Sequence, residues 1–125
     1  MRSLMVKVLV AGMLASLLAL GSPAVGAAVT IKAKGSPGNF SFSPRFPHVQ
    51  KGSKVAWKNI TPYQHQLSFY KGKWAGKSFT LSANGSFSKK PRKTGKYFYR
   101  CGVPGHSSLA GDNCTGMCGA FQVDN

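Results

Sequence analysis

The chain has 125 residues, of which 17 are Lys or Arg and only 2 are Asp or Glu, so its formal net charge is +15. The two acidic residues, Asp112 and Asp124, are too few for a paired-carboxylate hydrolase or an oxygen-rich Mg²⁺ or Ca²⁺ site. The 15 Gly and 7 Pro favour short strands joined by turns. Such a basic balance indicates a nucleic acid, an anionic membrane surface or an acidic protein as partner.

Residues 1–27 are predicted to be a signal peptide. Arg2 and Lys7 form a basic start, the apolar run at residues 8–20 is too short for a comfortable membrane span, and small residues follow it. The alternative is an uncleaved membrane anchor. We expect cleavage after Ala27 or Ala28, export to the periplasm or the medium, and a single domain at residues 28–125. Cleavage after Ala27 leaves 98 residues with a formal charge of +13.

The rest of the chain is predicted to be all-β. Alternating apolar and polar residues predict strands at residues 29–34, 40–43, 54–58, 64–69, 79–81, 86–90, 97–101 and 120–123. Turn sequences such as Ser36–Asn39 and Ala83–Gly85 separate them. No helix is expected. Seven to eight short strands with frequent turns predict a Greek-key β-sandwich or small barrel.

Side chains that bind soft metals gather near the end of the chain. Cys101 and His106 flank a four-residue Gly/Pro loop, Met117 follows, and His65 lies upstream at the start of a predicted strand. Two imidazoles and a thiolate, with a weak axial thioether, are the ligands of a blue-copper site. Each residue alone has an ordinary alternative, as a hydrogen-bonded His, a buried or disulfide-bonded Cys, or a packed Met.

Together these segments resemble a known family. Tyr97–Cys101, Pro104–His106 and Gly116–Gly119 resemble the C-terminal copper loop of the cupredoxins, and in particular of small plastocyanin-like and azurin-like proteins. Trp57–Asn59 followed by His65 resembles the first-ligand region of that family. The resemblance covers roughly residues 29–125 and implies one type 1 copper per chain. By matching positions, it implies the ligands His65, Cys101 and His106, with Met117 on the axis.

The spacing departs from that of the family at one place. Ten residues separate His106 from Met117, where related proteins have only a few, and this insertion contains Cys114. A disulfide between Cys114 and Cys118 would hold the longer loop and account for the odd number of cysteines. Alternatively, Met117 packs in the core, and a backbone oxygen or Gln122 lies near the metal.

These residues predict an exported type 1 copper protein that carries single electrons by Cu(I)/Cu(II) cycling. A periplasmic copper carrier or metallochaperone on the same fold is the first alternative, and an adhesion domain without metal is the second. An enzyme is not predicted, because no acid–base pair is available.

The basic residues form two clusters, at Lys71, Lys73, Lys77 and at Lys89, Lys90, Arg92, Lys93, Lys96. They are either a docking surface or solvated faces. We expect a monomer whose partner is a redox protein with an acidic docking surface or an anionic membrane-associated molecule. Export makes nucleic acid an unexpected partner. His48 lacks neighbouring metal ligands and is expected to be a surface residue.

Overall fold

The computed structural model describes residues 28–125. The predicted signal peptide, residues 1–27, lies outside the described residues. Eleven strands make up the fold: β1 (Val29–Ser36), β2 (Asn39–Ser43), β3 (His48–Gln50), β4 (Val55–Asn59), β5 (His65–Gly72), β6 (Ser78–Leu81), β7 (Ser86–Lys89), β8 (Gly95–Cys101), β9 (Ser107–Ala110), β10 (Asn113–Gly116) and β11 (Cys118–Asp124). In this part of the chain no helix is long and apolar enough to cross a membrane.

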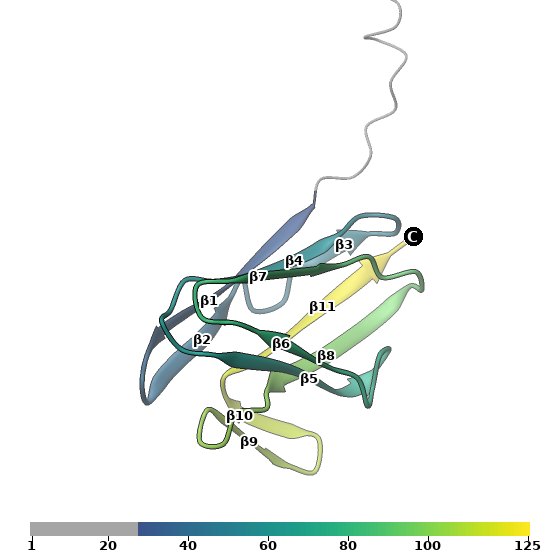
Figure 1. Cartoon of the computed structure of the whole chain (residues 1–125). Coiled ribbons are helices and arrows are strands. Elements are labelled where there is room, and N and C mark those ends of the chain that lie inside the picture. Colours follow the sequence, from purple (N-terminus) through teal and green to yellow (C-terminus); the bar gives the residue numbers. More distant parts are fainter. Residues whose placement is uncertain (1–27) are drawn as a thin grey trace, which may run out of the picture.

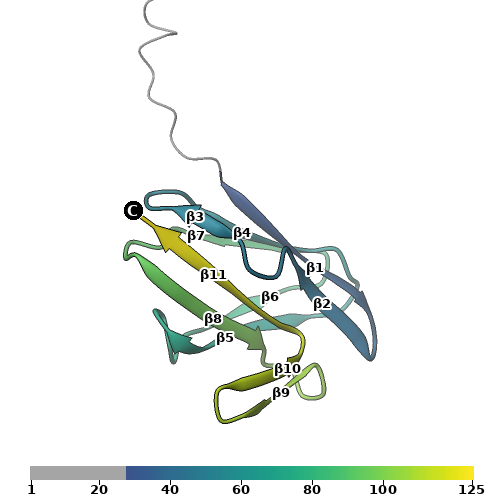
Figure 2. The same ribbon diagram turned by 180° about the vertical axis from the view of Figure 1, so that it is seen from behind.

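The strands form two facing sheets and a separate hairpin (Figure 1). One sheet has the order β2-β1-β4-β7, and the other has the order β3-β11-β8-β5-β6. Most neighbouring strands are antiparallel, but β1 pairs with β4 and β11 pairs with β3 in parallel. The β9–β10 hairpin projects from one end of the sandwich, as the view from behind also shows (Figure 2).

The inward faces of both sheets build one aromatic core. Trp57 on β4 and Tyr99 on β8 come from opposite sheets, are both fully buried, and have ring centroids 5.6 Å apart. Phe121 on β11 stacks on Tyr97 at 4.5 Å. Burying aromatic side chains of this size contributes much of the stability of a small sandwich.

The all-β sandwich predicted from the sequence is confirmed, but the prediction of seven to eight strands is wrong because the described chain contains eleven. The three additional strands are β3, β9 and β10. β3 has only three residues and one buried side chain, Val49, so it shows no alternation that could be recognised. β9 and β10 pair only with each other and leave most side chains exposed or half-buried, which removes the pattern on which strand prediction depends.

Antiparallel pairing of β5 with β8 positions the functional residues. Leu67 pairs with Cys101, which brings the beginning of β5 beside the end of β8. His65 at the start of β5 and Cys101 at the end of β8 therefore meet at the end of the sandwich that carries the β9–β10 hairpin (Figure 1).

Candidate metal centre

His65, Cys101 and His106 are brought together at this end of the sandwich. The Nδ1 atoms of the two histidines are 3.2 Å apart, and Sγ of Cys101 lies 3.6 Å from His65 Nδ1 and 3.4 Å from His106 Nδ1. His65 and Cys101 are fully buried, whereas His106 is half-buried. Two imidazole nitrogens and one sulfur, from two strands and a loop, thus form a compact triangle with one edge towards solvent.

The size and chemistry of this triangle fit a transition-metal ion. A metal about 2.0–2.3 Å from three ligands in a plane would set those ligands roughly 3.5–4 Å apart. The observed separations of 3.2–3.6 Å are within a few tenths of an ångström of that range. Among metals, two imidazoles and a thiolate in a trigonal set suit copper of the blue type.

The outer nitrogen of His65 is held by a short polar network. Thr61 Oγ1 lies 2.9 Å from His65 Nε2 and 2.7 Å from Asn59 Oδ1. Asn59 is itself fixed, because its amide donates to the carbonyls of Tyr63 and Ser82. When His65 Nε2–H donates to Thr61 and the Thr61 hydroxyl donates to Asn59, Nδ1 keeps its lone pair for a metal.

The charge state of His65 agrees with that role. Burial, together with the nearby His106, lowers the pKa of His65 from 6.5 to about 4. A buried imidazole with this pKa is neutral at neutral pH. Its Nδ1 can therefore bind a metal without first losing a proton.

Cys101 and His106 are joined by a tight turn. His106 donates its backbone N–H to the carbonyl of Val103 at 3.1 Å, with Pro104 and Gly105 between them. Gly105 has φ of +83°, which the third position of a type II turn requires. At the other side of the thiol, the backbone N–H of Gln66 approaches Cys101 Sγ at 3.5 Å. The turn and this contact fix the positions of both ligand atoms.

Met117 lies against the two loop ligands through its backbone. Its N–H donates to the carbonyl of His106, and its carbonyl accepts the N–H of Cys101, each at 2.9 Å. These backbone bonds place Met117 beside both loop residues despite the long insertion, and its side chain is fully buried in the hydrophobic core. Gln122, the alternative axial residue, instead pairs with Lys96 near the far end of β11 and bonds to Asp124.

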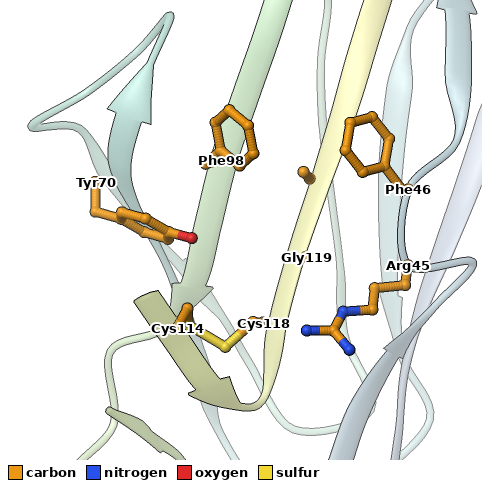
Figure 3. A pocket seen from close by; sticks show the side chains of 8 residues that line it. Arg45, Phe46, Tyr70, Phe98, Cys114, Cys118 and Gly119 are labelled. Atoms are coloured by element: carbon orange, nitrogen blue, oxygen red, sulfur yellow. A yellow bond between two sulfur atoms is a disulfide. The ribbon is translucent and has the colours of Figure 1, made fainter. Parts of the chain in front are cut away.

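The insertion between His106 and Met117 is the β9–β10 hairpin. A disulfide joins Cys114 on β10 to Cys118 on β11, the pairing expected from the sequence. Figure 3 shows this disulfide at a cavity on the outer face of β8 and β11, which Phe98 and Gly119 also line. Cys118 lines this outer cavity, whereas the side chain of its neighbour Met117 is buried in the core. The disulfide thus holds the hairpin without occupying the metal site.

One edge of His106 borders an uncharged cavity of about 460 Å³. Its walls come from the β1–β2 turn, the loop after Cys101 and the β9–β10 hairpin, and they include Phe40, Ser108 and Thr115. The ring of Phe40 lies 4.7 Å from His106 and 4.8 Å from His65. Phe40 therefore shields the imidazoles on one side while His106 keeps an edge accessible.

Several contributors to the site were not predicted. Asn59 and Thr61 orient His65, and Phe40 packs on both imidazoles, although no role at the site was predicted for any of them. The signal for the first two is a hydroxyl four residues before His65, preceded by an amide directly after the strand predicted at residues 54–58. His48, expected at the surface, is exposed and forms an ion pair with Asp124 at 2.8 Å.

The sequence matches no protein-family profile and no curated protein sequence. Solved structures of amicyanin are similar to this chain. The reduced Cu(I) form at pH 4 of a proline-to-glycine amicyanin mutant superposes with a TM-score of 0.58 at 19% identity, covering 82% of this chain and 87% of that chain. The reduced form of a tryptophan-to-tyrosine mutant gives 0.58 at 17% identity, covering 78% and 82%. The predicted resemblance is thus confirmed in three dimensions, and the chain has the cupredoxin fold.

Proposed function

We propose that this protein is an exported type 1 copper protein that carries single electrons between redox partners. The observation that supports this most directly is the triangle of His65 Nδ1, Cys101 Sγ and His106 Nδ1, with separations of 3.2–3.6 Å. The similar solved structures include amicyanin with Cu(I), which supports copper as the metal. Met117 is proposed as the axial ligand.

Bound copper would supply the chemistry, by alternating between Cu(I) and Cu(II). The protein would supply a site that moves little. Thr61 holds His65, the turn at Val103–His106 fixes the loop ligands, and Met117 links both of them through its backbone. A ligand set that is fixed in advance lowers the structural rearrangement that accompanies electron transfer.

His106 is the proposed electron port, because it alone among the three ligands is partly exposed. Electrons would pass from its accessible edge to a partner docked over the uncharged cavity. Docking of this type is weak and transient, as suits a carrier that must dissociate after each transfer.

Export is part of the proposal. The Cys114–Cys118 disulfide supports it, since structural disulfides persist in oxidising compartments such as the periplasm or the medium. The identity of residues 1–27 as a signal peptide is tested by N-terminal sequencing of the protein recovered from the periplasm, where Ala28 or Val29 is the expected first residue.

The proposed function is tested by adding Cu(II) and recording the visible spectrum. We expect one equivalent of copper per chain and an intense thiolate-to-copper charge-transfer band. Cys101→Ser should abolish the band, whereas the matched control Cys114→Ser/Cys118→Ser, which removes the disulfide and leaves no additional free thiol, should retain it. A wild-type protein without the band would disprove the type 1 assignment.

The same preparation separates an electron carrier from a copper carrier. An electron carrier retains its copper through repeated cycles of reduction by ascorbate and reoxidation, in the presence of a Cu(I) chelator. Transfer of copper to the chelator upon the first reduction would favour the metallochaperone alternative.

A further inference from the structure

A basic groove lies at the end of the sandwich remote from the metal ligands. It has a volume of about 600 Å³ and is formed by the β5–β6 turn, the end of β7 and the β7–β8 connection. Six cationic side chains line it: Lys73, Lys77, Lys89, Lys90, Arg92 and Lys93. We call these residues and the space between them the basic groove.

The groove continues into a second recess. This recess has a volume of about 380 Å³, shares Lys90 and Arg92 with the first and adds Lys51. Pro91, which is buried between the two shared cations, fixes the backbone at this point. The two recesses therefore adjoin each other at Lys90 and Arg92, and cationic side chains line both of them.

No carboxylate of the described chain neutralises these cations. Within residues 28–125 the two ion pairs are Lys71 with Asp112 and His48 with Asp124, and neither involves a residue of the basic groove. Six like charges around one groove repel each other, and an anionic partner would relieve that repulsion.

The groove is separated from the candidate electron port. It lies at the end of β5 and the start of β8, while the metal ligands lie at the start of β5 and the end of β8. The six steps from Gly95 to Cys101 span roughly 20 Å of extended strand. Figure 1 shows the β7–β8 connection at the opposite end of β8 from the β9–β10 hairpin. An occupant of the groove would therefore leave His106 accessible.

The lining indicates which kind of anion fits. A lipid surface would favour protruding apolar side chains, but the exposed large hydrophobic residues of the described chain, Phe46, Ile60 and Tyr63, lie elsewhere. A sugar or a base would need a free aromatic face. The ring of Trp74 instead packs against Tyr97 at 4.8 Å and lies under the ammonium of Lys89 at 5.6 Å. Lysine ammonium groups around two adjoining recesses suit the carboxylates of an extended acidic peptide.

We propose that the basic groove binds an extended acidic segment, rich in Asp and Glu, of a partner protein. Such a segment would tether the partner to one end of this molecule while the copper edge at the other end stays free for electron exchange. The groove contains none of the proposed metal ligands. Peptide binding to the groove can therefore be tested separately from the proposed copper chemistry.

The test is titration of the protein with a fluorescein-labelled oligo-glutamate peptide, followed by fluorescence anisotropy. We expect saturable binding that weakens with added salt and is the same with and without copper. Lys90→Glu/Arg92→Glu, which changes the two residues shared by both recesses, should weaken binding about tenfold or more. Lys73→Glu/Lys77→Glu, in the β5–β6 turn, should act in the same direction.

The matched control is Lys32→Glu/Lys34→Glu, which makes the same change in net charge at exposed positions on β1. It should reduce the affinity much less than either groove variant, and circular dichroism should show that all three variants are folded. Equal losses in groove and control variants would mean general charge attraction and would overturn the proposal. So would an absence of peptide binding, or binding only to a sulfated oligosaccharide or to phosphatidylglycerol vesicles.

Discussion

The Thr61 hydroxyl orients the buried imidazole of His65, a proposed metal ligand. It lies between His65 Nε2 and Asn59 Oδ1, so its removal leaves the imidazole N–H without a partner in a buried site. Residues that hold a ligating histidine in this way strongly affect metal affinity. We therefore expect Thr61→Ala to weaken Cu(II) binding about 10–100-fold, measured by competition with a chelator.

Thr61→Ser is the control for this prediction, because serine keeps the hydroxyl and removes only the methyl group. It should bind Cu(II) nearly as tightly as the wild type. If both variants lose affinity equally, packing of the methyl group rather than the hydrogen bond is what matters.

Protonation of His65 should make the metal-free protein sensitive to mild acid. Its pKa falls from 6.5 to about 4 on folding, so between these values the unfolded chain binds a proton that the folded chain does not. The free energy of unfolding should consequently fall as the pH decreases from about 6.5 to about 4, by up to roughly 3 kcal/mol. Urea unfolding of the metal-free protein at several pH values measures this.

His65→Gln should remove most of that pH dependence, since glutamine does not titrate in this range. A wild-type stability that is flat from pH 6.5 to pH 4 would contradict the buried, neutral state of the imidazole.

At the scale of the secondary-structure elements, the β9–β10 hairpin is held to β11 by the Cys114–Cys118 disulfide. The bridge closes a short loop, with a sequence separation of 4, so its effect on the entropy of the unfolded chain is modest. We expect Cys114→Ser/Cys118→Ser to lower the free energy of unfolding by about 2 kcal/mol, measured by urea denaturation.

The disulfide faces away from the metal ligands, which leads to a second expectation for the same variant. Copper binding should be retained, because the hydrogen bonds of Met117 to Cys101 and His106 hold the site from the inner side. Treatment of the wild type with a phosphine reductant should reproduce the loss in stability. Loss of the charge-transfer band in the double serine variant would show that the disulfide is needed to position a ligand.

The elements also show what sequence alone can and cannot predict. Strands with one buried face, such as β5 and β8, were predicted because apolar and polar residues alternate in them. Examples of the buried residues are Leu67 in β5 and Tyr97 and Tyr99 in β8. β9 and β10 were not predicted, because their pairing depends on backbone hydrogen bonds between mostly polar segments. A mostly polar segment cannot be distinguished from a loop unless the strand that pairs with it is known.

The site residues that could be predicted are those whose role is evident from nearby residues in the sequence. Cys101 and His106 stand in one short loop, and His65 begins a recognisable strand, so all three could be named from the sequence. The role of Phe40 could not, because it reaches the imidazoles from a strand 25 residues earlier in the chain than His65. Such contacts exist only after the two sheets pack.

At the scale of the whole molecule, the most unusual property is the large excess of positive over negative charge. The described residues include two carboxylates, and the six cations of the basic groove have no ion pair among them. Repulsion between these cations should destabilise the fold at low ionic strength. We expect the melting temperature to rise when NaCl is increased from about 0.01 M to about 0.1 M, which shortens the Debye length from about 30 Å to about 10 Å.

Calorimetry at the two salt concentrations measures this effect. Lys90→Gln/Lys93→Gln, which removes two of the groove charges without adding acid, should show a smaller rise than the wild type. A melting temperature that falls with salt would mean that attractive ion pairs outweigh repulsion.

The uncharged cavity at His106 and the basic groove lie at opposite ends of the molecule, so one end is strongly positive and the other is not. On a negatively charged electrode, adsorption through the groove would turn the His106 edge away from the metal surface and place most of the protein in between. On a neutral hydroxyl-terminated electrode, nothing holds the groove to the surface, so we expect the His106 end to contact it in part of the adsorbed molecules. Interfacial electron exchange should therefore be faster on the neutral electrode, even though less protein adsorbs there.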